Sequence, residues 1–211
     1  KTAVITNLIQ RKNLLKRPSV ANISDIYVTC SVDEPKLNFS QVSKLLINAE
    51  FINVKVSLIL TKCDLINFKQ RKYLEEKFKN WGYSPKTLNL NESFDFVHLI
   101  NELKSKRCSI LMGPSGVGKT TLLNKIIPNL NNPTANVSFK IKRGKNTTRN
   151  VELFSISNDS YIVDTPGFNL HEIEIPNYYI PQLFPEIFNQ LKQNKCRCKF
   201  NDCLHLDEPG C

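Results

Sequence analysis

The stretch from residue 108 to residue 127 limits the fold more than any other part of the chain. It reads CSILMGPSGVGKTTLLNKII and contains GPSGVGKT, a full match to G-x-x-x-x-G-K-[ST]. An apolar run typical of a strand precedes the motif, and a helical pattern that Pro128 ends follows it. In this context the glycines let backbone N–H groups and the positive end of the helix face phosphate oxygens. A strand, a phosphate loop and a helix are therefore predicted here.

Each position of this loop is a candidate nucleotide contact. The candidates are Gly113, Pro114, Ser115, Gly116, Val117, Gly118, Lys119, Thr120 and Thr121. Lys119 is expected to reach the terminal phosphates, and Thr120 is expected to ligate Mg²⁺. A tight glycine turn without a ligand is the alternative, but the flanking strand and helix argue against it.

Short apolar runs alternate with helical patterns around this loop. Strands are predicted at 26–32, 54–60, 85–90, 108–112, 151–156 and 161–165. Between the first four strands, apolar residues recur at helical spacing in three groups: Phe39, Val42, Leu45, Leu46 and Ala49; Tyr73, Leu74 and Phe78; Phe96, Leu99, Ile100 and Leu103. The alternation predicts an α/β fold, with parallel β-α-β units and a sheet covered on both faces.

Length and charge narrow the class of protein further. The 211 residues suffice for one nucleotide-binding domain with small appendages. Apolar residues make up 41% of the chain and charged residues 23%, which is typical of a soluble protein without a membrane partner. The net charge of +10 suits a polyanion such as RNA, although charge alone fits a solvated surface equally well.

The segment DTPGF, residues 164–168, is a second candidate phosphate-site element. Asp164 ends a predicted strand and can hold Mg²⁺ through water, while the backbone N–H of Gly167 can reach a γ-phosphate. Such turns are common, but this one follows the phosphate loop after a polar connection that contains Thr147 and Thr148. One of these threonines is expected to complete the Mg²⁺ shell, and Thr148 is favoured.

Residues 60–65, LTKCDL, match the N/T-K-x-D box that reads guanine. The box consists of Thr61, Lys62, Cys63 and Asp64 and directly follows a predicted strand, where an open α/β sheet binds ligands. Asp64 can accept both the N1–H and the exocyclic amine of guanine, which adenine does not offer in that arrangement. The stem of Lys62 would lie along the base. A solvated strand end is the alternative for this short pattern alone.

The order of the motifs is unusual for a GTPase. The guanine box and a candidate second base loop near Asn89 to Glu92 come before the phosphate loop, and the threonine switch and DTPGF come after it. The cyclic order is nevertheless that of other GTPases. A pocket depends on where groups lie in space, so a fold can be opened at another surface connection and keep its site. A circularly permuted P-loop GTPase, a Rossmann-like three-layer sandwich, is predicted.

Four of the seven cysteines lie between residues 196 and 211, which suggests metal binding in a reducing compartment. Cys198, Cys203, His205 and Cys211 form C-x4-C-x-H-x5-C, a closed set of three thiolates and one imidazole suited to structural Zn²⁺. An iron–sulfur cluster is the alternative metal centre, although the histidine favours zinc. Cys196 is the alternative to Cys198 as first ligand.

Together these strings resemble the RsgA (YjeQ/EngC) family of GTPases. The matching strings are RKNLLKRPSVAN (11–22), LTKCDL, GPSGVGKTTLLN (113–124), RGKNTTRNVEL (143–153), DTPGF and CKFNDCLHLDEPGC (198–211). The resemblance implies the end of an OB-fold in residues 1–22, a permuted GTPase domain in 23–175 and a zinc-binding domain in 176–211. It also implies a monomer that binds the small ribosomal subunit and its rRNA and is released on GTP hydrolysis. The expected location is the cytoplasm, or the plastid stroma if the gene is an organelle's.

The sequence departs from this family at the switch. The position that follows D-x-x-G is Phe168, which cannot position a water. Members of the family have a switch histidine that is thought to assist, but this chain has Asn146 there and Asn150 where a second histidine is common. Asparagine can orient water but does not titrate near neutral pH. Slow intrinsic GTP hydrolysis, stimulated by the small subunit, is expected.

Two functions of other classes compete with this interpretation. An ATP-using P-loop kinase or ATPase would make TKCD incidental, and competition between GTP and ATP separates the two. A zinc-bearing RNA-binding module with an inert phosphate loop would bind rRNA and zinc but no nucleotide.

Overall fold

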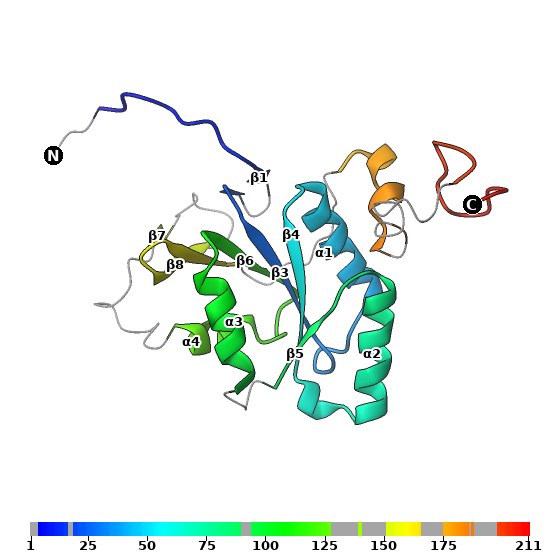
Figure 1. The fold of residues 1–211 in the computed structure, drawn as a ribbon, viewed down its shortest axis with the longest axis horizontal. Helices are drawn as coiled ribbons and strands as arrows, with labels where there is room; N and C mark the ends of the chain where they lie inside the picture. Colours follow the sequence, from blue (N-terminus) through cyan, green and yellow to red (C-terminus); the bar gives the residue numbers. More distant parts are fainter. Residues whose placement is uncertain are drawn as a thin grey trace.

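A single mixed sheet with helices on both faces organises the computed structural model (Figure 1). The structure describes residues 4–16, 19–89, 94–127, 139–140, 151–165, 175–185, 187 and 198–211. Among these residues, no helix combines the length and the apolar character that crossing a membrane requires.

The sheet has seven strands in the order β5-β4-β3-β6-β9-β8-β7. Their bounds are β3 (Asp25–Ser31), β4 (Lys55–Thr61), β5 (Lys86–Leu88), β6 (Cys108–Met112), β7 (Phe139–Lys140), β8 (Glu152–Ser157) and β9 (Ser160–Asp164). Neighbours from β5 to β9 run parallel, whereas β8 is antiparallel to both β7 and β9. Strands that precede the phosphate loop thus lie on one side of β6, and strands that follow the loop lie on the other.

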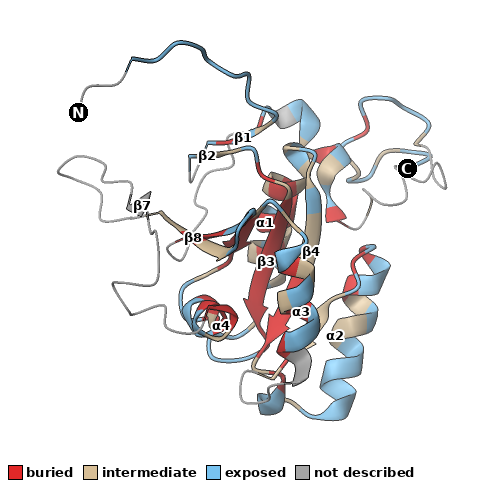
Figure 2. Cartoon of the chain, turned by 60° about the vertical axis from the view of Figure 1, so that its left-hand side comes forward, coloured by how far each residue is buried: buried red, intermediate tan, exposed pale blue. Residues whose placement is uncertain are grey.

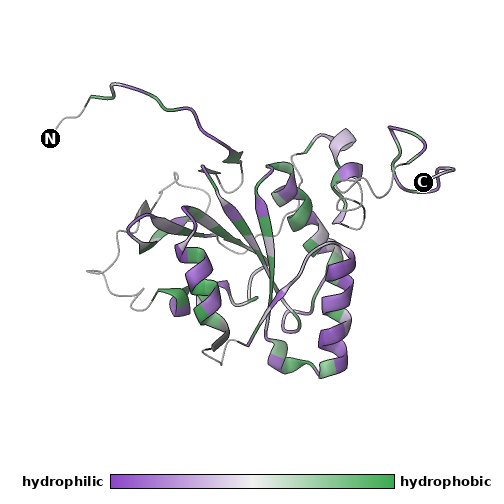
Figure 3. Cartoon of the chain, viewed as in Figure 1, coloured by the Kyte–Doolittle hydropathy of each residue, from purple (hydrophilic) through white to green (hydrophobic). Residues whose placement is uncertain are grey.

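In the part of the chain that the structure describes, four α-helices connect and cover the strands: α1 (Phe39–Phe51), α2 (Phe68–Asn80), α3 (Phe94–Lys104) and α4 (Lys119–Ile126). Asn38 begins α1, because its side chain accepts a hydrogen bond from the Gln41 N–H. Asn67 begins α2 through a reciprocal capping box with Gln70. The polar outer face of α2 stands out in Figure 3, and Phe78 is its one buried residue among those described.

Two apolar clusters fill the faces of the sheet, and the strands alternate between them. In β3, Ile26 and Val28 face the cluster beneath α1 and α2, while Tyr27 faces the cluster beneath α3 and α4. Figure 2 shows β3 buried at the centre of the sheet. Strands that are apolar on both faces therefore produce the continuous apolar runs seen in the sequence.

The predicted fold class is confirmed, and the element positions agree closely. The predicted strands at 26–32, 54–60 and 161–165 are each displaced by one residue from β3, β4 and β9. The predicted strand at 85–90 is longer than β5, which spans three residues.

The ends of the chain contain smaller elements. A two-stranded antiparallel ribbon pairs β1 (Leu14–Leu15) with β2 (Val20–Ala21) in the region assigned to the end of an OB-fold. After β9, the short 3₁₀ helices η2 (Asn177–Tyr179) and η3 (Pro181–Leu183) lie beside α1, and the Tyr179 ring is 5.6 Å from the Phe51 ring. The division into domains at residues 22 and 175 stays a prediction.

Candidate nucleotide site and metal centre

The phosphate loop leaves the carboxyl end of β6 and turns directly into α4. A Cβ atom on Gly113 would collide with the Thr29 carbonyl oxygen of the neighbouring strand. Gly116 and Gly118 have φ angles of +78° and +93°, in the region where glycine is preferred. The three glycines are thus required by the backbone path, and the loop has the geometry of an anion cradle.

Lys119, the first residue of α4, folds back over this loop. Its side chain is buried, and Nζ donates to the carbonyl oxygens of Gly113 at 2.8 Å and Pro114 at 2.7 Å. Burial lowers the pKa of the Lys119 ammonium, whereas the nearby Asp164 carboxylate opposes that change. The ammonium therefore lies inside the loop, where a terminal phosphate would replace the two carbonyl partners.

Asp164 ends β9, directly beside β6. Its Oδ1 atom is buried without a hydrogen-bond partner in the described part of the chain. Burial raises the pKa of this carboxyl group, while Lys119 opposes the change. A buried, unpaired carboxylate oxygen beside a phosphate loop is costly without a ligand, and it fits a hydrated Mg²⁺ ion.

Thr165 belongs to the DTPGF segment, but its role is not apparent from the sequence. It is fully buried, and its hydroxyl donates to the Leu111 carbonyl oxygen at 2.6 Å. This bond ties the end of β9 to β6, so it positions Asp164 next to the loop. Only the pairing of β9 with β6, which sequence spacing does not reveal, identifies this role.

The early TKCD box reaches the late phosphate loop through Thr61. Thr61 is fully buried, and its hydroxyl lies 2.6 Å from the Val117 carbonyl oxygen and 3.2 Å from that of Cys30. The bond to Val117 joins residues 56 positions apart in the sequence. The two motifs are therefore parts of one site.

Lys62 and Asp64 lie in the connection that follows β4. Lys62 has a left-handed backbone with φ 58°, and its Nζ donates to the Glu34 carbonyl oxygen. Asp64 lies in the short 3₁₀ helix η1 (Cys63–Leu65), and its side chain is exposed at this edge of the sheet. Cys63 points the other way: it is buried in the core, and burial raises the pKa of its thiol to about 11. Asp64 is thus the acidic member of the box, and its side chain is exposed to solvent.

The connection from β3 to α1, residues 32–38, is a further element of the site that sequence reasoning missed. Its Glu34 carbonyl holds Lys62, and its Pro35 Cδ atom lies 3.6 Å from the place of a Cβ on Gly116. It therefore touches both the guanine box and the phosphate loop.

The predicted second base loop, near Asn89 to Glu92, begins beside the guanine box. Leu88, the last residue of β5, pairs with Thr61 at the end of β4. Asn89 follows directly, whereas residues 90–92 lie outside the described part of the chain. The predicted switch residues Asn146, Thr147, Thr148, Asn150, Gly167 and Phe168 also lie outside it.

The four predicted metal ligands converge near the C-terminal end. The ligand atoms of Cys198, Cys203, His205 and Cys211 all lie within 4.8 Å of one another. His205 Nδ1 is 3.4, 3.5 and 3.6 Å from the three sulfur atoms. Tetrahedral Zn²⁺, with Zn–S of about 2.3 Å and Zn–N of about 2.1 Å, would hold sulfur and nitrogen about 3.6 Å apart. The donor set and its dimensions fit zinc, and Cys198 occupies the first position; Cys196 lies outside the described residues.

The histidine ligand is held by its neighbours. His205 has a φ angle of 62°, and the backbone N–H groups on either side, of Leu204 and Leu206, donate to the Glu208 carboxylate at 2.8 and 2.9 Å. Glu208 therefore closes the turn that presents the imidazole to the three thiols.

The fold and the nucleotide site define a P-loop protein of the GTPase type, with its strands in circularly permuted order. A model of the RsgA GTPase family matches residues 8–174, and the chain belongs to that family.

Relatives and solved structures agree with this assignment. A Prochlorococcus marinus protein named small ribosomal subunit biogenesis GTPase RsgA is 44% identical over 210 residues, which are 100% of this chain and 67% of the relative. The protein of the same name from a Synechococcus species is 40% identical over 209 residues, covering 99% of this chain and 68% of the relative.

Two crystal structures have the same fold. YjeQ from Thermotoga maritima has a TM-score of 0.74 at 30% identity, covering 97% of this chain and 68% of its own. YloQ, described as a circularly permuted GTPase, has a TM-score of 0.72 at 25% identity, covering 97% of this chain and 64% of its own. This chain thus spans about two thirds of the length of these proteins.

Proposed function

We propose that this chain binds GTP, hydrolyses it to GDP and phosphate, and acts in late maturation of the small ribosomal subunit. The observation that carries the proposal is the hydrogen bond from Thr61 to the Val117 carbonyl, which brings the guanine box to the phosphate loop. Curated relatives that match over the whole chain carry the name small ribosomal subunit biogenesis GTPase.

The residues divide the work of binding. The Lys119 ammonium and the backbone N–H groups of residues 113–121, apart from Pro114, which has none, hold the phosphates. Thr120, Thr148 and Asp164 hold Mg²⁺, which neutralises charge on the phosphates when bound. Asp64 accepts two hydrogen bonds from guanine, and the stem of Lys62 lies along the base. Thr61 and Cys63 support the box from the core, since both are buried.

Exchange of nucleotide tests the guanine site. GTP and GDP, but not ATP, should displace a fluorescent guanine nucleotide from the purified chain. Asp64→Ala should weaken guanine nucleotide binding at least about a hundredfold, because two charge-assisted hydrogen bonds are lost. Asp159→Ala removes an exposed carboxylate in the β8–β9 turn and is the matched control. Equal displacement by ATP and GTP would support the kinase or ATPase alternative, and no nucleotide binding at all would support an inert loop.

The hydrolytic step lacks the switch histidine of the resembled family, because Asn146 stands in its place and does not titrate near neutral pH. The backbone N–H of Gly167 meets the γ-phosphate, and Asn146 orients the attacking water, so intrinsic turnover is slow. Replacement of Asn146 by histidine should raise the GTPase rate in a single-turnover assay; Asn150→His, at the second position where the resembled family has histidine, is measured separately. An unchanged rate would argue against a role for this position.

The C-terminal cluster holds one structural Zn²⁺, since four protein ligands leave no open coordination position. The net charge of +10 supports a contact with rRNA phosphates. We place the chain in the cytoplasm, or in the plastid stroma for an organelle gene, as a monomer.

A further inference from the structure

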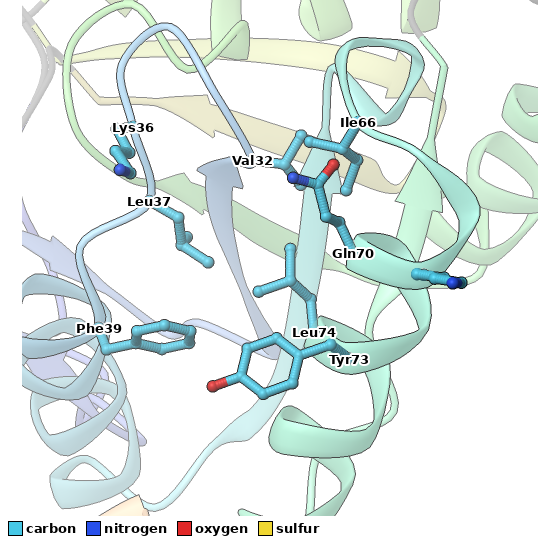
Figure 4. A pocket seen from close by; sticks show the side chains of 9 residues that line it. Val32, Lys36, Leu37, Phe39, Ile66, Gln70, Tyr73 and Leu74 are labelled. Atoms are coloured by element: carbon cyan, nitrogen blue, oxygen red, sulfur yellow. The ribbon is translucent and has the colours of Figure 1, made fainter.

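A groove of about 430 Å³ lies on the outer side of the guanine box (Figure 4). We name it the α1–α2 groove, because it lies between the connection from β3 to α1 and the first turns of α2. Its lining residues are Val32, Lys36, Leu37, Phe39, Ile66, Lys69, Gln70, Tyr73 and Leu74. Its volume lies within the range of about 300–1,000 Å³ that is usual for small-molecule sites.

The apolar wall of the groove is formed before any ligand arrives. Val32 belongs to the buried core beneath α1 and α2, and Leu37, Ile66 and Leu74 pack against that core. The Phe39 ring is held 5.8 Å from the Phe78 ring and 5.9 Å from the Trp81 ring. Binding of a ligand would therefore cost little conformational entropy for these side chains.

The charge of the groove is positive. Lys36 and Lys69 line it, and the lining contains no acidic residue. Within the described part of the chain, neither ammonium group has an ion pair or a hydrogen bond, unlike Lys72 and Lys86 elsewhere on the surface. In Figure 4, Lys36 lies at the end of the groove beyond Leu37. An apolar wall with two unpaired cations matches a ligand that has an apolar body and an anionic group.

The groove shares its walls with the nucleotide site. The connection that supplies Val32 and Lys36 also supplies the Glu34 carbonyl that holds Lys62, and Pro35 beside Gly116. On the opposite wall, Ile66 follows Asp64 by two residues. A ligand in the groove would thus contact the two segments that hold the guanine box in place.

We propose that the α1–α2 groove binds a small amphipathic anion, an aromatic or branched apolar group with one sulfonate, carboxylate or phosphate, and that this binding is coupled to guanine nucleotide affinity. The coupling rests on the proposed GTP site, whereas binding to the groove does not. Because coupling is reciprocal, nucleotide must change the affinity of the anion by the same factor.

Two fluorescent probes test the chemistry of the groove. Anilinonaphthalene sulfonate has an aromatic body and one anionic group, and N-phenylnaphthylamine has a similar body without the charge. Titration of the purified nucleotide-free chain should give saturable binding of one sulfonate probe per chain, tighter than the neutral probe. Non-saturable binding, or equal affinity for both probes, would show a plain apolar docking face and overturn the proposal.

Charge reversal locates the site. Lys36→Glu/Lys69→Glu should weaken the sulfonate probe about tenfold and leave the neutral probe unchanged. The control Lys44→Glu/Lys79→Glu makes the same charge change at exposed positions of α1 and α2 outside the groove. Tyr73→Ala, at a side chain that is 58% exposed, should weaken both probes without unfolding the chain. Equal loss in the control variant would contradict a site in the groove.

Addition of GDP and Mg²⁺ tests the coupling. Saturating GDP should shift the affinity of the sulfonate probe at least threefold in the wild-type chain. If Asp64→Ala still binds the probe but GDP no longer shifts it, binding and coupling are both supported. An unchanged probe affinity in a wild-type sample that binds GDP would refute the coupling. Failure of the chain to bind GDP would refute the proposed function, and with it the coupling, and would leave the groove to be judged by the probe titrations.

Discussion

At the scale of single residues, the phosphate site depends on a close backbone approach and on a buried hydrogen bond. A Cβ atom on Gly113 would collide with the Thr29 carbonyl oxygen, and the Thr61 hydroxyl donates a hydrogen bond to the Val117 carbonyl of the loop. Asp164 carries the opposite feature, a buried oxygen that has no hydrogen-bond partner among the residues that the structure describes. A site for a charged, metal-bound ligand requires both features: a closely packed loop to hold the phosphates and an unpaired carboxylate to hold the metal.

Gly113→Ala and Gly116→Ala provide a comparison of the two kinds of glycine. Alanine at residue 113 forces the backbones of β3 and the loop apart, so the free energy of unfolding should fall by about 2–3 kcal/mol. A Cβ atom at residue 116 would lie 3.6 Å from Pro35 Cδ, so there is space for alanine. The free energy of unfolding should fall only by the cost of a φ of +78° for a non-glycine residue, about 1 kcal/mol. Urea denaturation measures both, and equal losses would contradict this distinction.

At the scale of elements, the features that depend on residues close together in the chain could be predicted from the sequence. The strands and helices around the phosphate loop were predictable, because continuous apolar runs and helical spacing follow directly from a sheet buried on both faces. The ligands of the metal centre and the loop glycines were predictable from spacing within a few residues. Long-range contacts were not: the Thr165 bond to Leu111 and the contact of Pro35 with Gly116 follow only from which strands lie side by side.

At the metal centre, the prediction concerns the turn that Glu208 closes around His205. Glu208 accepts from the N–H groups on both sides of His205, so it positions the ligand without binding the metal. Glu208→Ala should lower zinc affinity about 10- to 100-fold, and Glu208→Gln, which keeps one carbonyl acceptor, should lower it less. Competition with a chromogenic chelator measures affinity, and the visible spectrum of the Co²⁺ form reports ligand geometry. The exposed Asp207→Ala is the control; a Co²⁺ spectrum and affinity unchanged by Glu208→Ala would rule out the positioning role.

At the scale of the whole molecule, the permuted order places the guanine box in the part of the chain before the phosphate loop and Asp164 in the part after it. The guanine box and β3 to β5 form one side of β6, while β8 and β9 form the other. The hydrogen bonds of Thr61 and Thr165 join both sides to β6 and its loop. The two sides can therefore respond together when the phosphates change.

Association with small subunits tests the proposed role of the whole chain. The purified chain should sediment with small ribosomal subunits in the presence of a non-hydrolysable GTP analogue and be released with GDP. The physical reason for this expectation is that a γ-phosphate orders the switch segments of GTPases, so its loss on hydrolysis would change a surface available to the subunit. Asp64→Ala should sediment equally weakly with either nucleotide at concentrations that saturate the wild type. Equal sedimentation of the wild-type chain with the GTP analogue and with GDP would contradict control of binding by GTP.

The position of the TKCD box ahead of the phosphate loop has a consequence for synthesis. Asp64 is synthesised 55 residues before Lys119, so the proposed guanine box would emerge from the ribosome before the phosphate loop is complete. In a GTPase of the usual order the cradle emerges first and could engage any nucleoside triphosphate. Here, vectorial translation would delay triphosphate capture until the proposed guanine box has already been synthesised.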